Sequence, residues 1–127
     1  MTARIALVAH DAKKDLMVEW AHRHVDVLGG FEIFATGTTG KRLSEDVGLQ
    51  VTRLMSGPMG GDAQLGAMIA EAKLDGLIFF IDPMTPVPHD VDVKSLLRLA
   101  ILYDTPLAVN RASATAVLTS LALKEQR

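Results

Sequence analysis

Short apolar runs alternate with amphipathic segments along the whole of this 127-residue chain. Five runs predict strands, at residues 5–9, 32–35, 51–55, 77–81 and 107–109. The first and fourth are apolar almost throughout, as strands covered on both faces are. Strands that alternate with helices form a parallel sheet between two helical layers. We therefore predict one α/β domain over residues 1–127, a three-layer α/β/α variant of the flavodoxin-like arrangement with a five-stranded parallel sheet.

The segments between the predicted strands carry apolar residues at helical spacing. A stripe with a period of about 3.6 residues marks a helix that buries one face. This pattern predicts helices around residues 16–25, 63–73, 93–101 and 114–122, with a shorter helix from about 41 to 48.

Charge and composition narrow the classes of function. The net charge of −2 provides no basic face, so a nucleic-acid partner is not expected. The chain has no cysteine, which excludes disulfides and thiol catalysis. Apolar runs fall short of the ~20 residues that a membrane span needs, and the sequence begins without the pattern of a signal peptide. We therefore expect a cytoplasmic protein that does not enter a membrane.

Polar clusters follow each predicted strand. They lie at residues 10–11, 36–40, 56–62 and 82–92 and at Asn110. In open α/β sheets, ligands bind outside the carboxyl ends of the strands, which meet at one edge. The polar clusters are therefore predicted to share this edge, and the ligand site is expected there.

The second cluster reads Thr36-Gly37-Thr38-Thr39-Gly40. Its backbone N–H groups, its three hydroxyls and the helix start after it form a combination that binds phosphate. Arg42 stands where a Walker loop requires Ser or Thr, so a single phosphate group is favoured over a nucleotide. A plain strand-to-helix turn capped by threonines is the alternative.

The third cluster ends in a carboxylate, Asp62, after a turn that holds three glycines. Ser56 and Gly57 at its start, with Gly60 and Gly61, would hold the same anion from the other side, because glycines let backbone N–H groups approach a ligand. Asp62 itself has two candidate roles. It would either cap the helix that follows or act as an acid or base on the ligand, and the surrounding glycines and Ser56 favour the second role.

His89 lies in a segment with three prolines, which restrict the backbone around it. A neutral imidazole there would donate a hydrogen bond to a substrate oxygen, with Asp92 as a supporting carboxylate. A helix start, or a weakly indicated metal site that includes Asp82, is the alternative. Lys14, one turn after Asp11, would reach a phosphate or remain at the surface.

These motifs, together with the runs at residues 77–80 and 94–100, resemble those of methylglyoxal synthases from about residue 5 to residue 114. The glycine-rich turn that ends in Asp62 is the most specific of them. The resemblance implies conversion of dihydroxyacetone phosphate into methylglyoxal and inorganic phosphate, without a metal or an organic cofactor, by a homohexamer. At the C-terminal end, members of that family continue into a tail with an arginine directed at a neighbouring subunit. The sequence after residue 122 departs from this pattern, which leaves phosphate-linked cooperativity open.

The resemblance also implies roles for individual residues. Asp62 would take a proton from the carbon beside the carbonyl, and His89 would bind the substrate oxygens. Asp11 and Asp92 would be supporting acids. The phosphate and the rest of the substrate would be held by His10, Lys14, Thr36, Gly37, Thr38, Thr39, Ser56 and Gly57.

Two other classes of protein compete with this reading. A domain of similar fold is the effector-binding part of large carbamoyl phosphate synthetases, but such a module needs neither Asp62 nor His89 for chemistry. A flavin carrier would need aromatic side chains to stack on the flavin, and the sequence offers only Trp20 and Tyr103, both in helical patterns.

Overall fold

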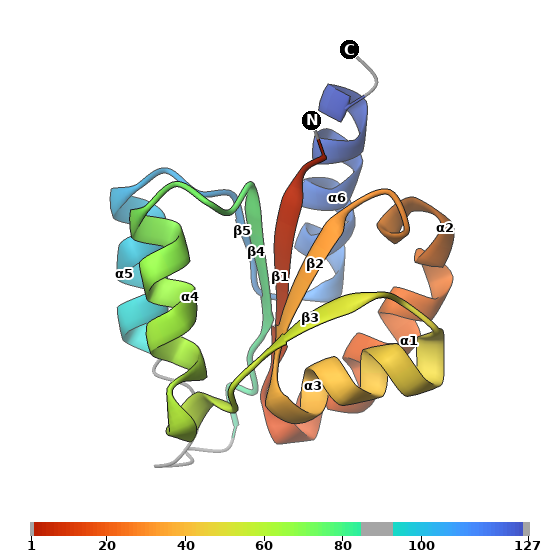
Figure 1. Cartoon of the computed structure of the whole chain (residues 1–127), viewed down its shortest axis with the longest axis horizontal. Coiled ribbons are helices and arrows are strands. Elements are labelled where there is room, and N and C mark those ends of the chain that lie inside the picture. The colour runs from red at the N-terminus through yellow and green to blue at the C-terminus, as the bar shows by residue number, and fades with distance from the viewer. Residues whose placement is uncertain (1, 85–92, 126–127) are drawn as a thin grey trace.

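The computed structural model describes residues 2–84 and 93–125 and shows one parallel sheet between two layers of helices (Figure 1). The strands are β1 (Arg4–Ala9), β2 (Glu32–Thr36), β3 (Val51–Leu54), β4 (Gly76–Phe80) and β5 (Leu107–Ala108). The α-helices are α1 (Lys14–Arg23), α2 (Val25–Leu28), α3 (Gly37–Arg42), α4 (Gly61–Ala70), α5 (Val93–Leu102) and α6 (Arg111–Glu125). Short helical turns are η1 (Asp11–Lys13), η2 (Leu43–Val47), which is a π-helix, and η3 (Gly57–Met59).

The five strands lie in the order β3-β2-β1-β4-β5, and every adjacent pair is parallel. Each predicted strand is confirmed to within one residue at either end. The first strand of the chain is the centre of the sheet, and the strand order reverses beside it. Helix α1, which follows β1, lies on one face of the sheet, and α5, the next described helix after β4, lies on the other face (Figure 1). Such a reversal opens a crevice at the carboxyl ends of the two strands.

Alternate side chains of the strands enter two separate cores. On one face Ile5, Leu7 and Ile78 pack with Met17 and Trp20 of α1 and with side chains of α2 and α6. On the other face, side chains of β1 and β4 pack against α4 and α5. Burial on both faces explains why β1 after Arg4, and β4, are apolar. Within residues 2–84 and 93–125, no helix combines the length and the apolar character that a membrane crossing requires.

The two helices that follow the glycine-rich turns begin earlier than the sequence predicts. Helix α3 begins at Gly37, directly after β2, rather than near residue 41. The predicted turn at residues 36–40 is therefore the end of a strand followed by the first turn of a helix. Gly37 makes this abrupt change possible because its φ of +32° is a conformation that side-chain-bearing residues rarely adopt. Helix α4 begins at Gly61, two residues before the predicted start.

Candidate active site

The turn after β2 and the turn after β3 are packed backbone against backbone. A Cβ atom added to Gly37 would lie 2.9 Å from the Cα atom of Ser56. Within the second turn, a Cβ atom added to Gly61 would lie 2.1 Å from the carbonyl oxygen of Met55. Neither position therefore tolerates a side chain without movement of the backbone. A surface pocket opens at this contact and is lined by Gly37, Thr38, Arg53, Leu54, Met55, Ser56 and Met59. The two predicted halves of an anion site do meet.

Asp62 lies in the first turn of α4, next to this contact. The helix is preceded by Gly60 at the N-cap position, with a φ of +116°, so Asp62 is not the N-cap residue. Its Oδ1 accepts a hydrogen bond of 2.9 Å from the N–H of Ala63, and the residue is partly exposed. Asp62 is therefore partly accessible, although it is not one of the residues that line the pocket.

His10 joins the carboxyl ends of β1 and β4 at the crevice. Its Nδ1 accepts a hydrogen bond of 2.9 Å from the N–H of Asp82, so the neutral ring carries its proton on Nε2. Oδ1 of Asp82 accepts the N–H of Met84 at 3.0 Å. The ring also meets Phe79 edge to face, with centroids 5.2 Å apart. His10 therefore fixes the place where the chain leaves β4 toward the predicted His89 segment.

Asp11 and Lys14, predicted separately as a supporting acid and a phosphate ligand, are paired with each other. The ammonium of Lys14 donates to Oδ1 of Asp11 at 2.6 Å. That hydrogen bond, together with the charge of Lys14, lowers the pKa of Asp11 below its ordinary value. The Lys14 side chain is only 19% exposed, whereas that of Asp11 is 86% exposed. The pair therefore joins a largely buried lysine to a solvent-exposed carboxylate.

Buried polar side chains mark the same edge. Among the residues that the structure describes, the buried polar side chains are His10, Thr36 and Thr39. Burying a polar group costs free energy unless the group forms a hydrogen bond. A cluster of buried polar side chains therefore draws attention to this edge as a candidate site. Thr38, between the two buried threonines in this turn, is exposed. Thr38 is one of the residues that line the pocket.

Some predicted residues cannot be placed. His89 and Asp92, together with most of the proline-rich segment, lie outside the described residues. Of the weakly indicated metal set, only Asp82 is described, and the part of the chain that is described brings no three His, Asp or Glu side chains together as ligands.

Sequence reasoning missed two residues of this edge, Asp82 as the partner of His10 and Arg53. Nε of Arg53 donates to the carbonyl oxygen of Gly37 at 2.8 Å. Knowledge of the strand order and register would have placed both residues at this edge. Arg53 is the register partner of Ala35, the residue before Thr36, on the neighbouring strand. Asp82 follows the strand that pairs with β1.

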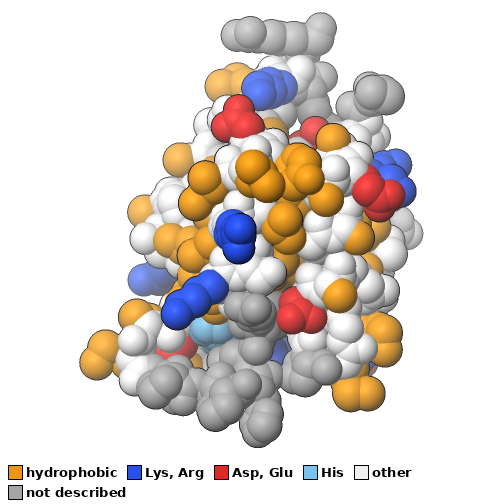
Figure 2. Space-filling view, turned by 90° about the vertical axis from the view of Figure 1, so that its left-hand side faces the viewer, with side chains coloured by type: hydrophobic (Ala, Val, Ile, Leu, Met, Phe, Trp, Pro, Cys, Tyr) orange, Lys and Arg blue, Asp and Glu red, His pale blue; other side chains and the backbone are white. Residues whose placement is uncertain are grey.

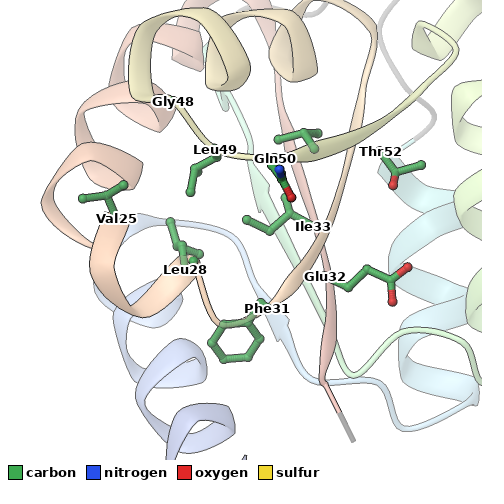
Figure 3. A pocket seen from close by; sticks show the side chains of 11 residues that line it. Val25, Leu28, Phe31, Glu32, Ile33, Gly48, Leu49, Gln50 and Thr52 are labelled. Carbon is green, nitrogen blue, oxygen red and sulfur yellow. The ribbon is translucent and has the colours of Figure 1, made fainter.

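A second hollow lies at the opposite end of the sheet, at the amino ends of β2 and β3 (Figure 3). Its volume is about 460 Å³, and Val25, Leu28, Phe31 and Leu49 turn apolar side chains toward it (Figure 3). The carboxylate of Glu32 points away from these side chains and pairs with Arg4 at 3.0 Å. This hollow offers no group positioned for acid–base chemistry.

The fold and its polar carboxyl edge define a particular class of α/β domain. Residues 16–109 match the family model of the MGS-like domain. The chain is 60% identical over 118 residues to the methylglyoxal synthase of Rhizobium rhizogenes, an alignment that covers 92% of this chain and 94% of that protein. It is 61% identical over 111 residues to the methylglyoxal synthase of Agrobacterium fabrum, covering 87% of each chain.

A solved structure agrees with these relatives. The crystal structure of methylglyoxal synthase from Elizabethkingia anophelis superposes with a TM-score of 0.89 at 51% sequence identity, covering 92% of this chain and 77% of that one. The chain therefore belongs to the methylglyoxal synthase family. It is an enzyme of the lyase class.

Proposed function

We propose that this chain converts dihydroxyacetone phosphate into methylglyoxal and inorganic phosphate. The observation that carries the proposal is the backbone contact between the turn at residues 36–40 and the turn at residues 56–61, directly before Asp62. In this proposal the two turns supply backbone donors suited to a phosphate group, and Asp62, in the first turn of α4, is the acid that acts beside them. The high identity to relatives named methylglyoxal synthase supports the same reaction.

In this mechanism Asp62 is the general base. It removes a proton from the hydroxyl-bearing carbon beside the carbonyl, and the electron pair forms an enediolate. Negative charge develops on the former carbonyl oxygen, where positioned donors stabilise it. We assign this role to His89. The enediolate then collapses with cleavage of the carbon–oxygen bond to phosphate, and the resulting enol becomes methylglyoxal.

The remaining predicted residues hold the substrate in this proposal. Thr38, Ser56 and Gly57 offer donors at the pocket or beside it, and Lys14 supplies the cation whose partner is Asp11. His10 orients the start of the segment that leads to His89 and Asp92. The buried residues of the same turn maintain its conformation; they are Thr36, Gly37 and Thr39. We assign the chain no metal or organic cofactor, because proton removal and phosphate departure need neither.

The direct test is to add dihydroxyacetone phosphate to the purified protein and to follow the products by ¹H and ³¹P NMR. We expect methylglyoxal and free phosphate in equal amounts. An effector-binding module of the same fold would bind a phosphorylated ligand and leave dihydroxyacetone phosphate unchanged, which would exclude the proposed reaction.

We also propose a homo-oligomer, with the hexamer as the expected state. Helix α5 and the residues after it expose Ile101, Leu102 and Tyr103 by 76%, 68% and 48%. Hydrophobic side chains gather on the face formed by α4 and α5, with basic side chains beside them (Figure 2). An apolar patch rimmed by polar groups is typical of an association surface.

Sedimentation velocity checks this point. The unmodified chain should sediment as a hexamer, and Ile101→Asp should shift it to smaller species with an unchanged far-UV circular dichroism spectrum. The matched variant Val27→Asp alters an exposed apolar residue on α2 and should leave the assembly unchanged. A monomeric unmodified chain would refute the oligomer and leave the proposed reaction standing.

A further inference from the structure

Arg53 contacts the turn at residues 36–40, which the proposed function assigns to the phosphate group. Its Nε donates to the carbonyl oxygen of Gly37 at 2.8 Å. Its stem runs past the next glycine of the turn, since a Cβ on Gly40 would lie 2.9 Å from Cγ of Arg53. One side chain from the edge strand therefore contacts both glycines of the turn.

The peptide group between Gly37 and Thr38 is what this contact controls. A trans peptide is planar, so its C=O and N–H point in opposite directions, and the described residues contain no cis peptide bond. When Arg53 holds the Gly37 oxygen on one side, the N–H of Thr38 must point to the other. That N–H belongs to the first turn of α3, where N–H groups have no partner inside the helix.

Glycine at position 37 makes such control necessary. With a φ of +32° and no side chain, Gly37 has access to conformations that would rotate this peptide plane. A hydrogen bond from Nε of Arg53 to the Gly37 oxygen selects one orientation of this peptide.

We propose that Arg53 is a positioning residue that locks the 37–38 peptide plane and thereby presents the Thr38 N–H to the anion. The inference rests on the proposed function for the identity of the anion. It assigns Arg53 no contact with the substrate. The position of its Nε matters in this proposal, and its net charge does not.

Three substitutions separate position from charge. Arg53→Gln places an amide N–H at the same number of bonds from the backbone as Nε but removes the charge. Arg53→Lys keeps the charge but moves the nitrogen one atom further out. Arg53→Met keeps the stem and removes both features. The control is Arg42→Met. Arg42 is an arginine at the end of α3, and the substitution breaks its ion pairs with Asp15 and Asp46.

The readouts are the dissociation constant of inorganic phosphate, from calorimetry, and the amide signal and hydrogen exchange of Thr38, from NMR. Because the hydrogen bond that fixes this peptide is lost, Arg53→Met should weaken phosphate binding about tenfold. The Thr38 amide should shift and exchange faster. We expect Arg53→Lys to resemble Arg53→Met, Arg53→Gln to recover most of the affinity, and Arg42→Met to keep it. KM for dihydroxyacetone phosphate should rise with the phosphate dissociation constant, with kcat little changed.

Several outcomes overturn the inference. Unaltered phosphate affinity in Arg53→Met would do so, as would an affinity in Arg53→Lys equal to or above that in Arg53→Gln, or an equal loss in Arg42→Met. Failure of the unmodified chain to bind phosphate would also overturn it. A chain that binds phosphate in the predicted order of variants but forms no methylglyoxal would refute the proposed reaction and support the role of Arg53.

Discussion

The two ends of the same sheet are built in opposite ways. At the carboxyl ends of the strands, glycine-rich turns touch backbone to backbone, and buried polar side chains gather beside them. At the amino ends of β2 and β3, a hollow of about 460 Å³ is lined mainly by apolar side chains (Figure 3). Both ends therefore hold a pocket, so concavity does not distinguish them. They differ in their polar groups, and a proposed active site requires convergent donors beside an ionisable group.

The largest expected difference between the ends concerns a carboxylate. Asp62→Asn should lower kcat by roughly 10²–10⁴, the usual effect of removing a general base, while phosphate affinity stays nearly constant. Glu32→Gln, at the amino ends of the strands, should leave turnover unchanged, since Glu32 only pairs with Arg4 at the surface. Steady-state kinetics and phosphate calorimetry measure both quantities. Normal turnover in Asp62→Asn would contradict the assignment of the general base to the carboxyl end of the sheet.

The next largest effect concerns backbone packing. Gly61→Ala brings a Cβ to 2.1 Å from the Met55 oxygen, so the backbone must shift. Overpacking of this kind lowers the free energy of unfolding by about 1–3 kcal/mol, and the shift should also weaken phosphate binding. Gly29→Ala beside the hollow would meet its nearest atom at 3.4 Å, an ordinary contact, and should be nearly neutral. Urea unfolding of the two variants tests this contrast, which equal destabilisation would contradict.

The smallest effect is electrostatic. Lys14 holds the pKa of Asp11 below its ordinary value of 3.8, so the pair stabilises the fold above that pH. Its contribution disappears as the pH falls through the lowered pKa. In Lys14→Met the pKa of Asp11 should rise toward 3.8, whereas Lys13→Met, one residue away, should change it less. Carboxyl ¹³C titration by NMR reports this directly, and an unmoved Asp11 in Lys14→Met would mean that the pair does not form in solution.

The fold was predictable because it depends on the spacing of apolar residues along the sequence. Apolar strands at residues 5–9 and 77–81, buried on both faces, indicated a parallel sheet, and the amphipathic stripes indicated its two covering layers. The helix starts were less predictable. Gly37 and Gly61 are weak helix formers by propensity, and they begin α3 and α4 because only glycine fits at these close contacts.

The site was predictable in part, for a different physical reason. Residues that follow strands were correctly expected at one edge, because the carboxyl ends of parallel strands meet there. Pairings between distant side chains and backbone groups were not visible. The bond from Arg53 to Gly37 and the bond from Asp82 to His10 depend on register and strand order, which the local pattern does not contain. The roles of Asp62 and His89 remain predictions.

The position of β1 in the middle of the sheet has a consequence for how the enzyme matures. The hydrogen bond between His10 and Asp82 spans 72 positions of the chain, and contacts of such long range form late and slowly. A nascent chain therefore carries both glycine-rich turns before its fourth strand has docked against the first. During refolding, catalytic activity should then return only when β4 pairs with β1, so the time course of activity would report this step.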